Sequence, residues 1–463
     1  MYVLYTVLLI LSGVGLLPRL LWRGWRGAIY HHGLWERCGW RVATHAASPA
    51  LAGCLWFHAA SVGEVQGVQP VLTALHTCFP RLPIVLSTFT PAGKLMAQRT
   101  VPEATAVFLL PFDLPWNMRR LIQQLRPRAL IVQETELWPH LLRAAAHQHV
   151  SVIVVNGRLS PRAFRRYLWI RPLMRRVLAD VTLLLAQSAE AASRFRRLGA
   201  VAQCLQVVGN TNIDRALLAA EQPVQQHPLA SLVQGRRLLV GGSTHAGEET
   251  ALLTVYGRLR VQHPDLLLVL APRHLERVEA VVRHVHASHY QALRRSQCNT
   301  SHTTTLDNSV VLILDTMGEL SILYRLCTMA FVGGSLVRVG GHNILEPAVF
   351  AKPVCFGPYM QHFPELAAML CEAGGAVQIH SVEELYVCMA RVLEQPDEGY
   401  AMGQCAFRAL VANRGALERT TQAVTALLGQ ATIPPPATAA LQSTTVGNGY
   451  GSRRAWRSVW KRS

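Results

Sequence analysis

Lysine is scarce in this chain of 463 residues: only Lys94, Lys352 and Lys461 occur, and every other basic residue is arginine. Acidic residues are also few, and 27 Asp and Glu against 45 Lys and Arg leave a net charge of +18. Guanidinium groups stay charged and bind phosphates and carboxylates in a forked geometry. The charge therefore favours anionic partners such as nucleic acid, phospholipid or a phosphorylated substrate, although a compositional bias of the source genome explains it equally well.

Several common motifs are missing. The ten cysteines form no C-x-x-C pair and no zinc-ligand spacing, which argues against a zinc finger or a redox motif. No G-x-G-x-x-G or P-loop sequence occurs, so nicotinamide and ATP chemistry are disfavoured. Because half of the chain (50%) is hydrophobic, disorder is excluded for most of it.

Long apolar runs are absent except at the N-terminus, where residues 2–18 carry no charge and Arg19, Arg23 and Arg26 follow. A cleaved signal peptide would carry its cations before the apolar run. We expect residues 1–30 to form an uncleaved membrane anchor with a basic flank, and the positive-inside rule then places the rest of the chain in the cytoplasm. A buried or an interfacial N-terminal helix is the alternative.

Beyond residue 50, short apolar runs alternate with longer amphipathic stretches, which is typical of βαβ units. We expect an α/β protein with two doubly wound, Rossmann-like domains that face a cleft, at 31–220 and 236–432. A linker at 221–235 joins them, and a disordered basic tail follows at 433–463. The expected strands are 55–59, 84–88, 129–133, 151–155 and 182–186 in the first domain, and 237–240, 266–270, 310–314, 329–332 and 353–356 in the second.

Carboxylates follow two of the expected strands in the first domain. Ligands of doubly wound sheets bind beyond the carboxyl ends of the strands. Glu64 follows the strand at 55–59 and is either a stabilising carboxylate at a helix start or a general base. Glu134 and Glu136 follow the strand at 129–133. Two carboxylates this close repel each other, so the pair is a functional candidate unless neighbouring arginines neutralise it.

Four strand ends in the second domain also carry polar residues. After the strand at 237–240, Ser243 or Thr244 is expected to cap a helix whose N–H groups are offered to an anion. Arg273 follows the strand at 266–270, where its guanidinium would bind a phosphate. The strand at 310–314 is followed by Met317, Gly318 and Glu319. Glu346 lies beyond the strand at 329–332, where its carboxylate would accept hydrogen bonds from a ribose.

These motifs resemble the 3-deoxy-D-manno-octulosonic acid (Kdo) transferases. From about His58 to beyond Gly357 the chain carries, in the order of that family, HAASVGEV, STFTPAG, LPFDLP, QETELWP, NGRLS, VGN, GGSTHAGEE, APRH, DTMGEL, FVGGS and GGHNILEPA. The resemblance implies a GT-B glycosyltransferase of the cell inner membrane that transfers Kdo from CMP-Kdo to the lipid A precursor in lipopolysaccharide synthesis. The implied partners are CMP-Kdo, the lipid A precursor and inner-membrane phospholipid, with no nucleic acid, metal or cofactor.

The resemblance also implies roles for single residues. Glu64 matches the proton acceptor, and Glu134 matches a position that stabilises the transition state. The positions that match the CMP-binding residues are Pro272, Arg273, Met317, Gly318, Glu319, Asn343, Ile344, Leu345 and Glu346. Further candidates for substrate binding are Ser243, Thr244, His245 and Glu136.

The chain departs from the family pattern at one catalytic position, because a lysine that stabilises the transition state is Asn212 here. An amide carries no charge, so we expect Arg215 or Arg158 to replace the cation, or the rate to fall. His140 and His362 also replace asparagines of the family, and Ile344 replaces a proline. The alternatives are a GT-B enzyme with a UDP-sugar donor and a catalytically impaired membrane scaffold. The number of Kdo residues transferred stays open.

Overall fold

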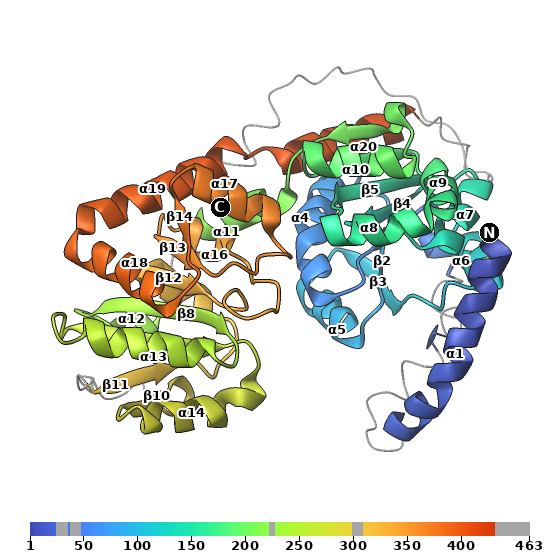
Figure 1. The fold of residues 1–463 in the computed structure, drawn as a ribbon. Coiled ribbons are helices and arrows are strands. Elements are labelled where there is room, and N and C mark those ends of the chain that lie inside the picture. The colour runs from blue at the N-terminus through green and yellow to red at the C-terminus, as the bar shows by residue number, and fades with distance from the viewer. Residues whose placement is uncertain (25–35, 38–47, 222–226, 299–308, 431–463) are drawn as a thin grey trace. The chain divides into compact units, whose positions relative to one another are not determined.

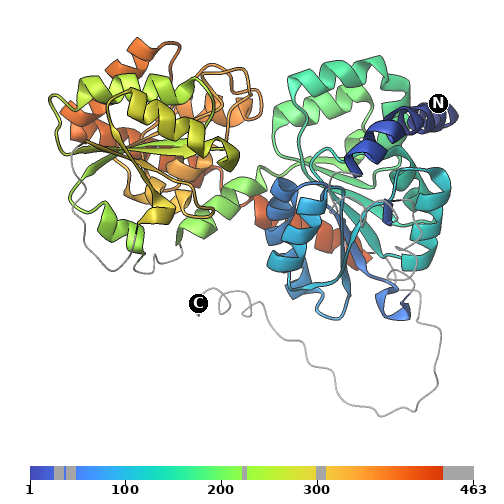
Figure 2. The same ribbon diagram turned by 90° about the horizontal axis from the view of Figure 1, so that it is seen from below.

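The structure is a computed structural model that describes residues 1–24, 36–37, 48–221, 227–298 and 309–430. Residues 1–425 form one compact unit, in which the strands make two sheets of seven strands each. Helices lie on both faces of each sheet (Figure 1, Figure 2). The chain therefore has the α/β, doubly wound architecture that the alternation of apolar and amphipathic segments predicts.

The first sheet is parallel and has the strand order β3-β2-β1-β4-β5-β6-β7. All five strands expected in this half are present, and β3 and β7, at the two edges, are additional. Strands β1 and β4 are buried along their whole length, as strands covered by helices on both faces must be. The bounds are β1 (Leu55–His58), β2 (Ile84–Thr88), β3 (Ala104–Leu109), β4 (Ala129–Gln133), β5 (Ser151–Gly157), β6 (Leu183–Ala186) and β7 (Leu205–Val207).

The second sheet is also parallel, with the order β10-β11-β9-β8-β12-β13-β14. Its five expected strands are present, and the additional strands β10 and β14 again lie at the edges. The strand order reverses between β8 and β12, as it does between β1 and β4 in the first sheet. The bounds are β8 (Arg237–Thr244), β9 (Leu266–Pro272), β10 (Gln291–Arg294), β11 (Val310–Ile313), β12 (Met329–Val332), β13 (Val354–Phe356) and β14 (Ala376–Gln378).

Local sequence starts many of the helices. Several begin with a proline in the first turn, which needs no N–H there, and the hydroxyls of Thr90, Ser160, Ser188 and Ser381 accept an amide hydrogen bond as N-caps. In the first half the helices are α1 (Tyr2–Gly24), α4 (Val62–Cys78), α5 (Pro91–Thr100), α6 (Pro115–Leu125), α7 (Pro139–His147), α8 (Pro161–Trp169), α9 (Arg171–Ala179), α10 (Ala189–Leu198) and α11 (Thr211–Glu221). In the second half they are α12 (Pro228–Leu232), α13 (Glu248–Leu259), α14 (Val278–Ala287), α15 (Leu320–Leu326), α16 (Leu345–Ala348), α17 (Pro364–Glu372), α18 (Val382–Glu394), α19 (Pro396–Ala412) and α20 (Ala416–Gln430).

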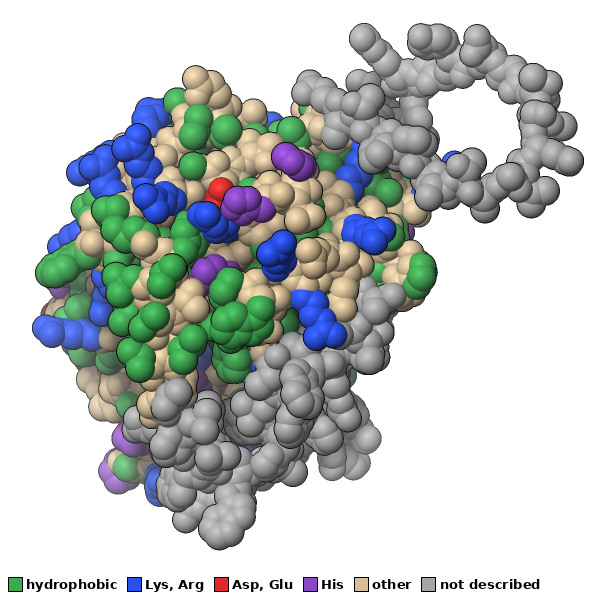
Figure 3. Space-filling model, turned by 90° about the vertical axis from the view of Figure 1, so that its right-hand side faces the viewer, with side chains coloured by type: hydrophobic (Ala, Val, Ile, Leu, Met, Phe, Trp, Pro, Cys, Tyr) green, Lys and Arg blue, Asp and Glu red, His purple; other side chains and the backbone are tan. Residues whose placement is uncertain are grey.

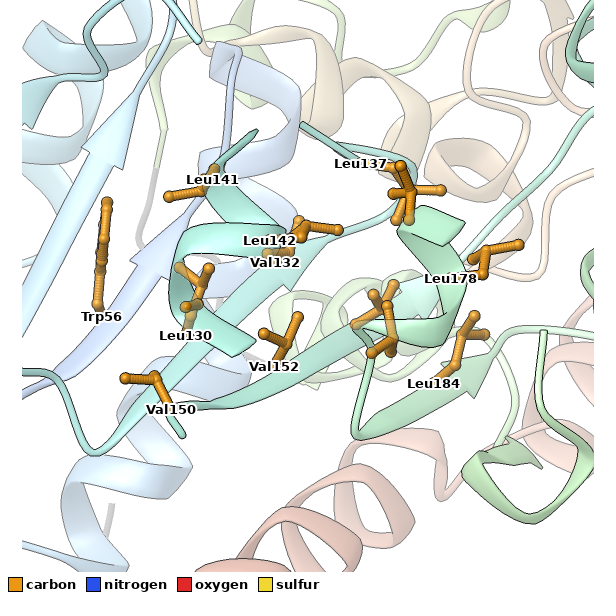
Figure 4. Close-up of a cluster of buried hydrophobic side chains, with 14 of the residues drawn as sticks. Trp56, Leu130, Val132, Leu137, Leu141, Leu142, Val150, Val152, Leu178 and Leu184 are labelled. Atoms are coloured by element: carbon orange, nitrogen blue, oxygen red, sulfur yellow. The ribbon is translucent and has the colours of Figure 1, made fainter. Parts of the chain in front are cut away.

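Apolar side chains from strands and helices fill the space between each sheet and its helices. In the first half, Trp56 of β1 and Leu130 and Val132 of β4 pack with Leu141 and Leu142 of α7 (Figure 4). Each of these five side chains is buried. Burial of this kind is the main favourable contribution to folding, and it holds the strand ends in place.

The N-terminal helix α1 packs against the first half through one side. The Tyr2 hydroxyl donates to Asp180 (3.1 Å), the Tyr5 hydroxyl donates to Asp113 (3.0 Å), and the Thr6 hydroxyl lies 2.8 Å from His140 Nε2. Among the described residues, no helix has the length and apolar character needed to cross a bilayer. The expected membrane-spanning anchor is therefore not confirmed.

Two helices lie between the sheets in the sequence. Helix α11 ends at Glu221, and the short helix α12 occupies part of the predicted linker. Residues 222–226 of that linker, residues 25–30 of the predicted anchor segment, and the predicted tail at 433–463 lie outside the described residues. The boundaries of the two predicted domains stay a prediction.

Candidate functional site

A cavity of about 1430 Å³ is lined by residues that follow strands of both sheets. Residues at the reversal of strand order in each sheet contribute to its lining. Doubly wound sheets bind their ligands at such reversals. Nine of the candidate residues line it: Glu64, Glu134, Asn212, Ser243, Arg273, Gly318, Asn343, Leu345 and Glu346. The other candidates are not among its lining: Glu136, Thr244, His245, Pro272, Met317, Glu319 and Ile344.

Glu64 lies in the first turn of α4, directly after β1. One of its carboxylate oxygens accepts the Ala60 N–H (2.7 Å) and the other accepts the Ser61 hydroxyl (3.0 Å). Burial raises the pKa of Glu64 to about 8, and repulsion from Glu136 and Glu134 adds to the shift. A carboxyl group held in this way is a strong base once it loses its proton.

Glu134 follows β4, on the other side of the strand reversal. Its backbone has φ 54°, a left-handed conformation that is unfavourable for a glutamate and is typical of functional sites. Burial raises its pKa, although Arg158, whose Nε lies 3.6 Å from Glu134 Oε2, works against the shift. Arg158 also donates from Nη1 to the carbonyl of His362 (3.0 Å).

Glu136 has a different environment from Glu134. Strand β4 ends at Gln133, so the two side chains do not lie on the same side of a continuing strand. The Trp138 indole donates to Glu136 Oε2 (2.9 Å), and His58 Nε2 lies 3.8 Å from the same oxygen. That nitrogen of His58 is buried and has no hydrogen-bond partner. The predicted carboxylate pair is therefore divided: Glu134 lines the cavity, whereas Glu136 does not line it but still repels the Glu64 carboxylate.

Asn212 lies in α11 and lines the cavity next to Gln133. A Cβ placed on Gly67 would be 3.3 Å from Asn212 Oδ1 and 2.9 Å from Gln133 Nε2, so both amides reach the same point of α4. The two suggested replacement cations line the same cavity. Arg215 has a buried Nε without a hydrogen-bond partner, and burial lowers its pKa, whereas the nearby Glu346 opposes that shift.

Arg273 is an exposed residue at the end of β9. Its backbone N–H donates to the Thr244 carbonyl (3.0 Å), which leaves the guanidinium out of this bond. Among the described residues, no carboxylate lies within ion-pair distance of it. Nearby, Asn343 donates to Glu346 Oε1 (3.3 Å), and burial raises the pKa of Glu346. The arrangement offers the Arg273 guanidinium for a phosphate and the Glu346 carboxyl group for hydroxyls.

Four other candidates have surroundings that differ from the expectation. Glu319 accepts hydrogen bonds from Arg295 (3.0 Å), and Met317 is 85% exposed. Ser243 and Thr244 belong to β8, and Gly247 is the N-cap of α13, so the predicted Ser or Thr cap is wrong. A turn at residues 245–247 delays the helix by three residues.

Sequence reasoning missed Glu248, although it stands in the GGSTHAGEE motif. The carboxylate is fully buried and accepts the N–H groups of His245 (2.9 Å), Gly334 (2.7 Å), Ser335 (2.9 Å) and Leu336 (2.9 Å). Of these four donors only His245 belongs to the segment that was expected to offer N–H groups to an anion, and the other three come from the loop after β12. The sequence did contain a signal for a role of Glu248, because two adjacent glutamates stand at a helix start next to a glycine-rich strand end.

Comparisons with known proteins agree with the geometry. The family model described as 3-deoxy-D-manno-octulosonic-acid transferase (kdotransferase) matches residues 32–215. The chain is 34% identical to the 3-deoxy-D-manno-octulosonic acid transferase of Haemophilus influenzae over 84% of this chain and 90% of that one, and 32% identical to that of Bordetella pertussis over 90% and 97%.

A solved structure supports the fold. A putative UDP-N-acetylglucosamine 2-epimerase from Listeria monocytogenes superimposes with a TM-score of 0.60 at 16% identity, over 83% of this chain and 98% of that one. At that identity the likeness concerns the GT-B-like fold alone. The sequence relatives go further: this chain belongs to the family of 3-deoxy-D-manno-octulosonic acid transferases and is a glycosyltransferase.

Proposed function

We propose that this protein transfers Kdo from CMP-Kdo to the lipid A precursor, with Glu64 as the general base. The observation that carries the proposal is that Glu64 and Arg273 line one cavity. A transferase of this kind needs a base for the acceptor hydroxyl and a cation for the departing phosphate. No metal or cofactor is part of the proposal.

The donor half of the proposed reaction rests on Arg273, Asn343 and Glu346. A guanidinium without a carboxylate partner is available for a phosphate, which it binds through parallel N–H groups. The Glu346 carboxyl, held by Asn343 Nδ2, accepts hydrogen bonds from a ribose. Because Met317 and Glu319 do not line the cavity, we assign them no direct contact with the cytidine monophosphate.

The acceptor half rests on Glu64, with Glu134 beside it. In the proposed step, Glu64 takes the proton of an acceptor hydroxyl as its oxygen attacks the anomeric carbon of Kdo. Arg158 lies at Glu134 and lines the cavity, so it supplies the positive charge that Asn212 does not carry. Burial and the neighbouring carboxylates make Glu64 a base that works best near or above pH 8.

Attachment to an anionic inner-membrane surface is a further part of the proposal, and it rests on α1. One side of its first three turns packs on the protein, while Val3, Leu4, Val7, Leu8, Ile10 and Leu11 are exposed. Figure 3 shows the side of the molecule that carries α1, where hydrophobic side chains lie beside Lys and Arg and little Asp or Glu is visible. An apolar face among cations is typical of a helix that lies in a membrane interface.

The decisive experiment is an assay of Kdo transfer from CMP-Kdo, generated in situ, to tetraacylated lipid A precursor. We expect transfer by the wild-type protein and almost none by Glu64→Gln. The matched control is Glu279→Gln, since the Glu279 side chain is 66% exposed and pairs with Arg294. Absence of transfer by wild type, or equal transfer by wild type and Glu64→Gln, would contradict the proposal.

A ligand-induced thermal shift separates the donors. A ligand that binds only the folded state raises Tm, so we expect CMP to raise it more than UMP does at equal concentration. The reverse order would favour a UDP-sugar donor on the same fold.

A further inference from the structure

Two histidines meet at the strand reversal of the second sheet. His245 follows β8, and His342 lies in the loop that follows β12. Their Nε2 atoms are 2.8 Å apart and the ring planes differ by 6°. At this distance one Nε2 must donate a hydrogen and the other must accept it, so two charged rings are excluded. A neutral pair, or a pair with one added proton, fits this contact.

The backbone is shaped to admit this pair. Gly334, with φ 66°, lies where the rings meet, and a Cβ there would be 3.0 Å from His342 Nε2 and 3.5 Å from His245 Cδ2. His342 lines the cavity together with Arg273. The pair therefore touches the part of the cavity that is proposed to hold the donor phosphate.

Arginines, further histidines and two glutamates lie around the pair. His274 is edge-on to His245, with ring centroids 5.5 Å apart, and Arg273, Arg277 and His362 act on one ring or the other. Two acidic residues lie next to His245: Glu249 is paired with Arg277 (2.9 Å), and Glu248 accepts the backbone N–H of His245 (2.9 Å). Burial lowers the pKa of His342 to about 4 and also lowers that of His245, and the neighbouring arginines add to both shifts, so the neutral form of each ring is favoured.

We propose that the His245–His342 pair takes up one proton when a nucleotide phosphate binds beside Arg273. This proposal rests on the proposed function and assigns the pair a task within it. The donor phosphate is a diester with one negative charge, whereas the released monophosphate carries nearly two at pH 7. The additional proton gives the pair a charge of +1, which compensates the negative charge that appears on the phosphate as the sugar leaves.

The proposed step balances. The acceptor oxygen forms a bond to the anomeric carbon, the bond between that carbon and the phosphate oxygen breaks, and the electron pair stays on the phosphate. Glu64 takes the hydroxyl proton. The proton that the pair takes up comes from solvent and binds at the free Nδ1 of one ring, because a hydrogen already lies between the two Nε2 atoms. It leaves again when the monophosphate leaves.

The sign of the pH dependence follows from linkage. An anion beside neutral imidazoles raises their pKa, so proton uptake accompanies binding and affinity increases as the pH falls. For one proton the affinity changes by up to about tenfold per pH unit. A site whose charge is supplied by arginine alone would take up no proton of this kind, because arginine does not titrate in this range.

The test is isothermal titration calorimetry of CMP against the full-length protein at pH 7.5, in buffers of different ionisation enthalpy. We expect uptake of about one proton or less per CMP in the wild type. In His245→Asn and in His342→Asn this uptake should vanish, and CMP should bind more weakly than to the wild type but still measurably. His380→Asn is the matched control, since His380 is exposed and lies outside the cavity lining.

Cytidine is the second ligand, because it lacks the phosphate and should bind without proton uptake. Equal uptake by wild type and both variants, or equal uptake with cytidine and CMP, would overturn the inference alone. Failure of the wild type to bind CMP would overturn the proposed function as well, so the two failures are distinguishable.

Discussion

Glu64 and Glu248 occupy similar places in the two halves of the molecule and have opposite surroundings. Each lies at the start of the helix that follows a strand at the reversal of its sheet, β1 or β8. Glu248 is fully buried and accepts four backbone N–H groups. Glu64 accepts one N–H and one hydroxyl, and it faces two other carboxylates.

The difference shows how one residue type serves two purposes. Burial raises the pKa of both carboxyls, but in Glu248 the four N–H donors counteract the shift, whereas in Glu64 the neighbouring carboxylates increase it. A carboxylate whose oxygens are fully used joins segments of backbone. One that is left short of donors keeps an affinity for protons, which a general base needs.

Replacement of Glu64 is expected to have the largest effect on activity. We expect Glu64→Gln to lower Kdo transfer by about 10²–10⁴-fold, the usual contribution of a general base. In the wild type, the rate should rise with pH and level off above about 8, where Glu64 is ionised. The check is a pH–rate profile with Glu279→Gln beside it. A profile that is flat between pH 6 and 9 would contradict the assignment.

Replacement of Glu248 should act on stability instead. Glu248→Ala leaves four buried N–H groups without their acceptor, and we expect a loss of about 2–4 kcal/mol in the free energy of unfolding. Urea unfolding measures it, with Glu276→Ala as the control because that side chain is 78% exposed. A change within 0.5 kcal/mol of wild type, roughly that of a surface substitution, would show that the loop after β12 does not depend on Glu248.

Replacement of Arg158, the cation beside Glu134, should have a smaller effect on the rate of Kdo transfer. We expect Arg158→Met to lower transfer by about tenfold, from the loss of one charged hydrogen-bonding group, and Asn212→Lys alone to change it little. Combined with Arg158→Met, Asn212→Lys should restore most of the rate. Unchanged transfer in Arg158→Met would leave Arg215 as the replacement for the missing lysine.

The smallest expected effect is on thermal stability at high pH. A carboxyl whose pKa is raised in the folded state stabilises the fold below its unfolded pKa, and that contribution is lost as the pH rises through about 8. The glutamine in Glu64→Gln does not ionise, so this variant does not lose stability at high pH for this reason. Its Tm, measured relative to wild type, should therefore be higher at pH 9 than at pH 6, whereas Glu279→Gln should show no such trend.

The predicted strands divide into two groups in the structure. Every expected strand is present, and the four that were missed, β3, β7, β10 and β14, are the edge strands of the two sheets. Strands covered on both faces are continuous apolar runs that a sequence reveals. An edge strand is partly exposed, as in β7, whose three residues include no buried one, so its apolar signal is weak.

The candidate site was predictable to a similar degree. Placement at strand ends and family motifs identified Glu64, Glu134, Arg273 and Glu346, and all four line the cavity. The motifs did not reveal that Glu136 faces His58 rather than the cavity. Whether a side chain enters a cavity depends on the turn that follows the strand, and the left-handed backbone of Glu134 is such a turn.

The sequence by itself determined the class of fold, the central strands, the family and most of the residues at the strand ends, because these depend on local pattern and short motifs. The tertiary structure decided which of those residues meet. Glu248 binds backbone from residues 334–336, and His342 reaches His245, across separations of about ninety residues. Contacts of that range depend on how the sheet is assembled, and no local pattern of residues specifies them.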